Sequence, residues 1–344
     1  MTRFDDAPLR GAVTSAELAD TAAWIAGLQR PDGMILWNEG GHCDPWNHVE
    51  TAMALDTMGL HERAVLAYRW LAGAQRADGS WHNYYLGDGS VKDPKLDTNV
   101  CAYVATGAWH HWLCTRDASF VAEMWPVVRR AIEWVLSMRR ADGLVLWARE
   151  VDAAPWDYAL LTGSSSIRHA LHCGANLAAV AGLHQPEWRA VADHLDAAIS
   201  GTAEVFEPKD RWAMDWYYPV LTGAVTGTDA SSRLQRQWGE FVIEGRGVRC
   251  VSDEDWVTAA ETAECALAHA VVGDRERALD LLSWTRAHRL ESGAYLTGIV
   301  YPHRTVFPAD EVSAYTGAAV ILAADALAGS SPASALFGGL AVLD

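Results

Sequence analysis

Residues 62–81 read ERAVLAYRWLAGAQRADGSW, and residues 98–109 read TNVCAYVATGAW. In the first stretch, apolar residues recur at helical spacing and one face carries charges, which is typical of a helix with one side in solvent. The second stretch is rich in Ala, Val, Gly and Cys, which is typical of a helix packed on all sides. Together they predict a hairpin of one outer and one inner helix.

The same alternation of outer-type and inner-type segments runs along the whole chain, and strand signals are scarce. Six such hairpins predict an all-α fold, a single-domain (α/α)6 toroid. We expect the toroid over residues 16–330, an N-terminal extension over residues 1–15 and a C-terminal tail over residues 331–344. The expected helices cover residues 16–30, 46–58, 61–76, 97–115, 118–140, 165–183, 186–206, 215–226, 230–244, 255–272, 275–290 and 310–328.

A shared turn closes three of the expected outer helices. It reads GLQRPDGMILW at residues 27–37, GAQRADGSW at residues 73–81 and MRRADGLVLW at residues 138–147. We expect the Gly of each Asp-Gly pair to adopt a positive φ and stop the helix, and the following Trp to fold back as a plug.

Composition and charge narrow the functional class. The 344 residues include 27 basic and 44 acidic side chains, a formal charge of -17, which argues against nucleic acids and anionic lipid surfaces as partners. No run of about eighteen apolar residues is present, so no membrane span is predicted. The six cysteines lie far apart without CxxC pairs, which predicts reduced core residues, and the N-terminus lacks a secretory signal, which predicts a cytoplasmic location.

Two segments resemble the six-hairpin glycosidases, especially the glucoamylase-like family. Residues 116–147 are similar to the third outer helix of that family, and residues 307–327 are similar to its last inner helix. The resemblance implies glycoside cleavage by paired carboxyl groups. It places the general base at Glu311. The family's acid position holds Ala148 here, which leaves Glu150 or Asp157 of the same loop to supply the acid.

Other segments resemble a second group of toroids. QRADGSW at residues 75–81 is similar to the QW repeat of squalene-type cyclases, and residues 214–223 and 249–262 resemble bacterial proteins labelled prenyltransferase. This resemblance implies an alternative function, an isoprenoid cyclase with a carboxylic acid as proton donor and aromatic walls. A non-catalytic sugar-binding toroid is a further alternative.

In a toroid, the loops that lead into the inner helices gather at one end, here called the mouth end. It is defined by residues 42–50, 95–99, 160–169, 214–218, 249–256 and 307–315, which are rich in acidic and aromatic residues. Paired carboxylates suit acid–base chemistry, and aromatic rings suit the apolar face of a sugar or a carbocation. Helix capping would also explain some of the polar residues, namely Asp44, Asp97, Ser164, Asp253 and Asp310.

Five carboxylates are the catalytic candidates: Glu311, Asp253, Asp255, Glu150 and Asp157. The substrate-binding candidates are Asp44, Trp46, His48, Asp97, Asn99, Trp147, Trp156, Arg168, Asp215, Trp216, Tyr217, Tyr218, Arg249, Trp256 and Tyr315. Glu261 and Glu264 fall within an expected inner helix, where we expect Arg249 or Arg168 as their partners.

The expected partner is a small molecule, either a glycoside or an isoprenoid. No phosphate loop or dinucleotide fingerprint is present, so no cofactor is predicted. Two His/Cys groups, one at residues 42–48 and one at residues 169–173, do not match a zinc spacing, so no metal is predicted. The chain contains 17 Trp against 10 Tyr and 6 Phe, and part of this surplus falls in the mouth-end segments, which favours a ligand with flat apolar faces.

Overall fold

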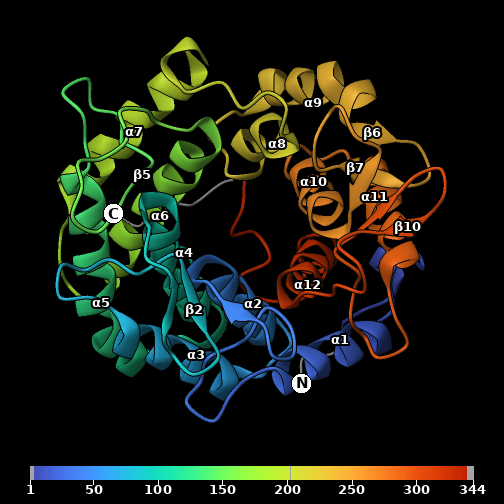
Figure 1. Cartoon of the computed structure of the whole chain (residues 1–344), viewed down its shortest axis with the longest axis horizontal. Coiled ribbons are helices and arrows are strands. Elements are labelled where there is room, and N and C mark those ends of the chain that lie inside the picture. The colour runs from blue at the N-terminus through green and yellow to red at the C-terminus, as the bar shows by residue number, and fades with distance from the viewer. Residues whose placement is uncertain (1–3, 202, 339–344) are drawn as a thin grey trace.

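Twelve α-helices form a closed double ring in the computed structural model, which describes residues 4–201 and 203–338 (Figure 1). Each inner helix contacts the next one along the ring, and the last inner helix contacts the first. The inner helices are α2 (Pro45–Thr57), α4 (Thr98–Thr115), α6 (Leu161–Val180), α8 (Ala213–Leu221), α10 (Ala259–Val271) and α12 (Ala314–Ala328). The outer helices are α1 (Ser15–Gly27), α3 (His61–Ala74), α5 (Ala118–Ser137), α7 (Pro186–Ser200), α9 (Gly227–Phe241) and α11 (Arg275–Trp284). The predicted (α/α)6 toroid is therefore confirmed.

Several predicted helix ends are wrong by a few residues. The helix expected from residue 310 begins at Ala314, because Asp310 has a left-handed φ of 56° and the Ser313 side chain caps the helix. The helix expected from residue 255 begins at Ala259, because Trp256–Thr258 forms a strand. The outer helices expected to reach residues 140 and 206 end at Ser137 and Ser200.

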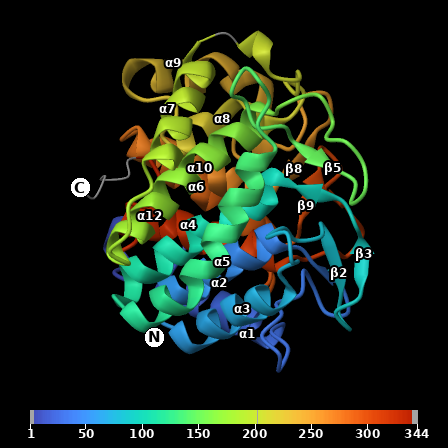
Figure 2. The same cartoon turned by 90° about the vertical axis from the view of Figure 1, so that its left-hand side faces the viewer.

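Short strands gather at the mouth end, as Figure 2 shows. The largest sheet has the order β10-β9-β8-β7-β6, and the other two have the orders β1-β2-β3 and β4-β5. All neighbouring strands are antiparallel. Their bounds are β1 (His42–Cys43), β2 (Tyr84–Leu86), β3 (Val91–Asp93), β4 (Leu96–Asp97), β5 (Ala148–Arg149), β6 (Val242–Ile243), β7 (Gly247–Arg249), β8 (Trp256–Thr258), β9 (Gly298–Val300) and β10 (Thr305–Val306).

The shared turn after the outer helices has the predicted backbone. Gly33, Gly79 and Gly143 have φ values of 101°, 97° and 90°, and each preceding Asp accepts a hydrogen bond from the backbone N–H two residues later. A fourth turn of this kind, which was not predicted, ends at Gly293 with a φ of 87°. A backbone bridge joins Arg289 to Tyr295 across it, as bridges join Gln29 to Ile35 and Arg139 to Val145 across two of the other turns. Trp81 folds back as predicted: it is fully buried and donates to the Leu71 carbonyl over 2.8 Å.

Both terminal segments pack against the ring. Near the N-terminus, Phe4 and Leu9 are buried, and the Pro8 carbonyl accepts a hydrogen bond from Arg275. At the other terminus, the Leu336 carbonyl lies 3.0 Å from His169 Nε2, and Phe337 stacks on the same ring. Residues 1–3 of the expected extension and 339–344 of the expected tail lie outside the described residues.

The C-terminal segment crosses the ring at the end opposite the mouth (Figures 1 and 2). It reaches α6 through Leu336 and Phe337, and Gly338 packs against Val271 at the end of α10 and against Gly223 just after α8. Among the described residues, no helix combines the length and apolar character needed to cross a membrane.

Asp56, near the end of α2, joins two neighbouring helices at this far end. Its carboxylate lies 2.8 Å from His111 Nδ1 on α4 and 3.0 Å from His61 Nδ1 on α3. Burial alone would raise the pKa of Asp56, but the hydrogen bonds from the two histidines outweigh burial and lower it. The same contact raises the pKa of His61.

We expect Asp56→Asn to lower the free energy of unfolding by about 3 kcal/mol, because a buried ion pair loses its acceptor charge. The lowered pKa of Asp56 contributes to the free energy of unfolding at pH values above the unfolded pKa of about 3.9. The raised pKa of His61 contributes below about pH 6.5, and this contribution is lost as the pH rises through the folded pKa. Thermal unfolding of both proteins between pH 4 and 8 checks this. A stability difference that does not shrink above pH 6.5 would contradict a charged His61.

Candidate functional site

Two acidic residues begin inner helices at the mouth end. Asp44 caps α2 by accepting from the Asn47 N–H over 2.8 Å, and Asp97 caps α4 by accepting from the N–H groups of Asn99 and Val100. Burial raises the pKa of Asp44 to about 6 and also raises that of Asp97. The capping role expected for Ser164, Asp253 and Asp310 is wrong, because Leu160, Thr258 and Ser313 occupy those cap positions.

Two glutamates lie one turn or more inside the ring. Glu50 projects from α2 and Glu264 from α10, and each residue is only 4% exposed. Glu264 accepts hydrogen bonds from the Tyr217 hydroxyl of α8 and, over 2.5 Å, from the Tyr315 hydroxyl of α12. Glu50 accepts one from the Tyr103 hydroxyl of α4 over 3.2 Å. Five of the six inner helices therefore build the pair: α2 and α10 carry the glutamates, and α4, α8 and α12 supply the hydroxyl donors.

Burial shifts the pKa of both carboxyl groups upward, and the two groups influence each other. Burial raises the pKa of Glu264 to about 7, while the Tyr217 and Tyr315 hydroxyls act in the opposite direction and favour the carboxylate. Burial also raises the pKa of Glu50, and the negative charge of Glu264 raises it further. The charge on Glu264 thus favours the protonated form of Glu50, and a neutral carboxylic acid beside a carboxylate is the combination that acid–base catalysis requires.

The expected arginine partners of Glu264 are wrong. Arg249 pairs with Asp255 over 2.8 Å, and Arg168 pairs with Asp196 over 2.6 Å. Tyrosine hydroxyls satisfy Glu264 instead, and the Thr258 hydroxyl donates to Glu261, for which the arginine partners are also wrong; within residues 4–201 and 203–338 neither glutamate forms an ion pair.

Aromatic rings surround the glutamate pair. Trp46 stacks on Tyr103 with ring centroids 4.0 Å apart and planes 2° apart, and Tyr218 lies 6.0 Å from Trp46. Tyr103 also donates to Glu50, so the stack and the carboxyl group are held together. Four predicted substrate-binding residues thus lie beside the pair: Trp46, Tyr217, Tyr218 and Tyr315.

A second aromatic group lies at the start of α4. Trp147 Nε1 donates to Asp97 over 2.5 Å, and Trp156 lies 4.9 Å from Trp147. Asn99 is half-buried at the same helix start, and its side-chain oxygen is buried without a hydrogen-bond partner. The structure therefore brings together Asp97, Asn99, Trp147 and Trp156, as a shared binding surface would require.

The five predicted catalytic carboxylates differ in position. Glu311 is half-buried just before α12 and accepts from the Thr297 hydroxyl over 2.9 Å. Asp253 and Asp255 have side chains that are 59% and 51% exposed and are paired with Arg211 and Arg249. Glu150 is exposed, and Asp157 is 88% exposed beside Arg140. Glu311 is therefore the one of the five that lies within the ring of inner-helix starts without an arginine partner in the described chain.

Other predicted binding residues make contacts within the protein. The two ring nitrogens of His48 face the backbone of Ala67 and Ile35. Trp216 donates to the Arg233 carbonyl and stacks on Phe241. The remaining two are Asp215, which accepts from Thr162, and Trp256, which donates to the Phe307 carbonyl.

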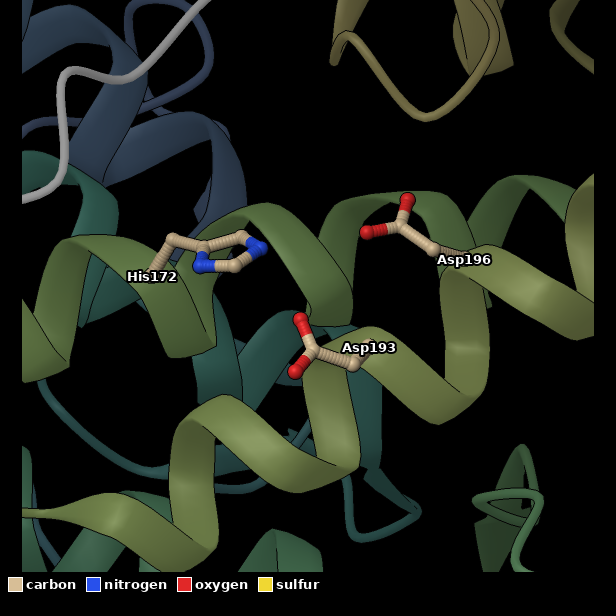
Figure 3. A group of neighbouring side chains, drawn as sticks. All are labelled: His172, Asp193 and Asp196. Atoms are coloured by element: carbon tan, nitrogen blue, oxygen red, sulfur yellow. The ribbon is translucent and has the colours of Figure 1, made fainter.

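One group of metal-type ligands lies away from the mouth end. Figure 3 shows His172 of α6 facing Asp193 and Asp196 of α7, and their ligand atoms lie within 4.8 Å of one another. The Arg168 guanidinium is already 2.6 Å from Asp196, and burial lowers the pKa of His172 to about 4. The Arg168 side chain is thus the cation that neutralises Asp196, and the ion pair between them links inner helix α6 to outer helix α7.

Comparison with known proteins gives a clear relationship. No protein-family model matches the chain. The chain is 46% identical over 330 residues to the MMP endo-(1,4)-3-O-methyl-alpha-D-mannosidase of Mycolicibacterium hassiacum, a match that covers 96% of this chain and 91% of that protein.

Solved structures support the fold. A glycosidase superposes with a TM-score of 0.73 at 14% identity, covering 93% of this chain and 100% of that chain. A sugar epimerase from a ruminal bacterium gives a TM-score of 0.69 at 11% identity, over 89% of this chain and 96% of that one. A D-mannose isomerase gives 0.65 at 14% identity, over 91% and 96%. With nearly half its residues identical to those of the Mycolicibacterium mannosidase over almost the full length, the chain belongs to that family of glycoside hydrolases, on the six-hairpin toroid.

Proposed function

We propose that this protein is an endo-acting mannosidase that cleaves α-(1,4) bonds between 3-O-methylated D-mannose units. The substrate class is the one that the name of the Mycolicibacterium relative gives for that protein. The observation that carries the proposal is the pair of buried glutamates, which tyrosine hydroxyls from three inner helices hold in place and whose pKa values burial raises. The proposed place of action is the cytoplasm.

Glu50 is the proposed general acid. Its carboxyl proton passes to the glycosidic oxygen as the bond from that oxygen to the anomeric carbon breaks, so the departing sugar leaves as a neutral alcohol. In the same step, the ionised Glu264 either accepts a proton from a water molecule whose oxygen bonds to the anomeric carbon, or bonds to that carbon itself. In the second case a water molecule later replaces Glu264 at the anomeric carbon and gives its proton to Glu50. The Tyr217 and Tyr315 hydroxyls support this role because they stabilise the carboxylate form of Glu264.

The family resemblance predicts Glu311 as the base, and this remains a prediction, as do the other four predicted catalytic carboxylates. Two features favour Glu264 over Glu311: its raised pKa and its place opposite a second buried carboxyl group. Trp46 is the proposed stacking surface for the sugar at the cleaved bond, because its ring is fixed against Tyr103 next to Glu50.

The test is incubation of the protein with a reduced, α-(1,4)-linked oligosaccharide of 3-O-methyl-D-mannose, followed by mass spectrometry of the products. We expect fragments of intermediate length to form first, because an endo-acting enzyme cuts inside the chain. An unmethylated α-(1,4)-mannan oligosaccharide of the same length is the control for the methyl group. Release of single sugars from one end, or no cleavage, would contradict the proposal.

A further inference from the structure

Partly exposed aromatic rings form an arc of two groups over one half of the mouth end. In the first group, the distances between ring centroids are 6.1 Å from Tyr315 to Trp37, 5.5 Å from Trp37 to His42 and 4.7 Å from His42 to Tyr84. The aromatic arc is defined as Tyr315, Trp37, His42, Tyr84, Trp147, Trp156 and Tyr158, all of them between buried and exposed. It starts at the catalytic pair, because the Tyr315 hydroxyl binds Glu264.

The chain around Lys95 joins the two halves of the arc. The Asn83 N–H, next to Tyr84, donates to the Lys95 carbonyl over 2.8 Å, and Asp97, two residues further on, accepts from Trp147 Nε1 over 2.5 Å. Beyond Trp147, the ring centroid of Trp156 lies 4.9 Å from that of Trp147. The centroid of Tyr158 lies 6.4 Å from that of Trp156, and the planes of these two rings are 10° apart. The arc thus runs from the start of α12 past the starts of α2 and α4 to the loop before α6.

Two lysine ammonium groups lie over aromatic rings of the arc. The Lys95 ammonium lies 4.6 Å from the Trp147 ring centroid, and the Lys92 ammonium lies 5.9 Å from that of Tyr84. Ion pairs lie in both halves of the mouth end: Lys95 with Asp97 and Arg140 with Asp157 beside the arc, and Arg211 with Asp253 and Arg249 with Asp255 opposite it. The series of ring contacts is therefore the feature that defines the arc.

We propose that the aromatic arc binds successive sugar units of the substrate chain on one side of the cleaved bond; this rests on the proposed function. Sugar rings have apolar C–H faces that pack on aromatic rings, and a methyl group on O3 replaces a hydroxyl proton with further apolar surface. The rings are held by contacts within the protein before any substrate arrives, so little ordering is needed on binding. Affinity therefore increases with the number of sugars that reach along the arc.

The test compares kcat/KM for short and long 3-O-methylmannose oligosaccharides in the wild type, Trp156→Ala and Trp212→Ala. Trp156 lies towards the far end of the arc, and Trp212 is a matched control on the other half, 44% exposed and beside the Arg211 guanidinium. We expect the wild type to prefer the long chain. Trp156→Ala should lower the long-to-short ratio of kcat/KM about tenfold, through KM on the long chain, which corresponds to about 1.4 kcal/mol. Trp212→Ala should leave the ratio unchanged.

Three outcomes would overturn the inference. One is an equal loss on short and long chains in Trp156→Ala, which would indicate a structural role. Another is a wild-type enzyme that cleaves both lengths equally well, which would leave the proposed function standing. The third is a wild type that cleaves neither chain, which would contradict the proposed function and remove the arc's ligand with it. Thermal unfolding of each variant shows whether a loss comes from misfolding.

Discussion

Replacing Glu264 with glutamine should lower kcat by about a thousandfold and leave the fold intact. A glutamine has the same shape and still accepts a hydrogen bond, but it carries no charge and takes up no proton, which removes an acid–base contribution of roughly 10²–10⁴. The charge of Glu264 also helps to keep Glu50 protonated, so the substitution disturbs both halves of the pair. Single-turnover hydrolysis of the methylated oligosaccharide measures the loss.

The pH profile of the wild type gives an independent readout. Activity requires the carboxylate form of Glu264, so kcat/KM should fall as the pH drops through its pKa of about 7. Glu264→Gln should lose this acidic limb. Glu254→Gln is the control, because Glu254 is exposed at the mouth end. Full activity in Glu264→Gln, or an equal loss in Glu254→Gln, would refute the assignment.

Gly79→Ala should lower the free energy of unfolding by about 3 kcal/mol. Gly79 has a φ of 97°, and a Cβ at this position would lie 2.3 Å from the backbone oxygen of Arg130 on α5. The substitution therefore combines an unfavourable φ with a clash against a helix backbone that has little freedom to move. Chemical denaturation with urea measures the change.

Gly89→Ala separates the two causes. Gly89 has a φ of 85°, yet a Cβ there would meet no atom within 4 Å. This control should cost only the conformational strain, roughly 1–2 kcal/mol. If the two variants lose the same stability, the close approach of the turn to α5 contributes nothing.

The toroid could be predicted from the sequence because the inner helices carry small apolar residues on every side, as in α12. The sheets at the mouth end could not, because strands of two or three residues show no useful alternation. Local backbone conformations also shifted helix starts, as the left-handed Asp310 does before α12.

The buried glutamate pair was harder to predict than the fold. Tyr217 and Tyr315 stood among the predicted binding residues, but nothing in a sequence shows that both hydroxyls converge on Glu264. Glu50 lies in a mouth-end segment that drew attention to Asp44 and Trp46, and the sequence analysis missed it. The available signal was a carboxylate within a helix expected to be packed on all sides, which applies to Glu50 and Glu264 but also to Asp56 at the far end.

The C-terminal segment that crosses the far end of the ring has a consequence for the path of the polymer. Because Leu336 and Gly338 pack against the inner helices there, this segment covers the far end of the toroid, and the ring is open at the mouth end. Under the proposed function, a long chain would then have no exit at the far end and would lie across the mouth end, without needing a free end to enter. Both fragments must then depart by the side from which the chain arrived, and the speed of their departure can limit turnover.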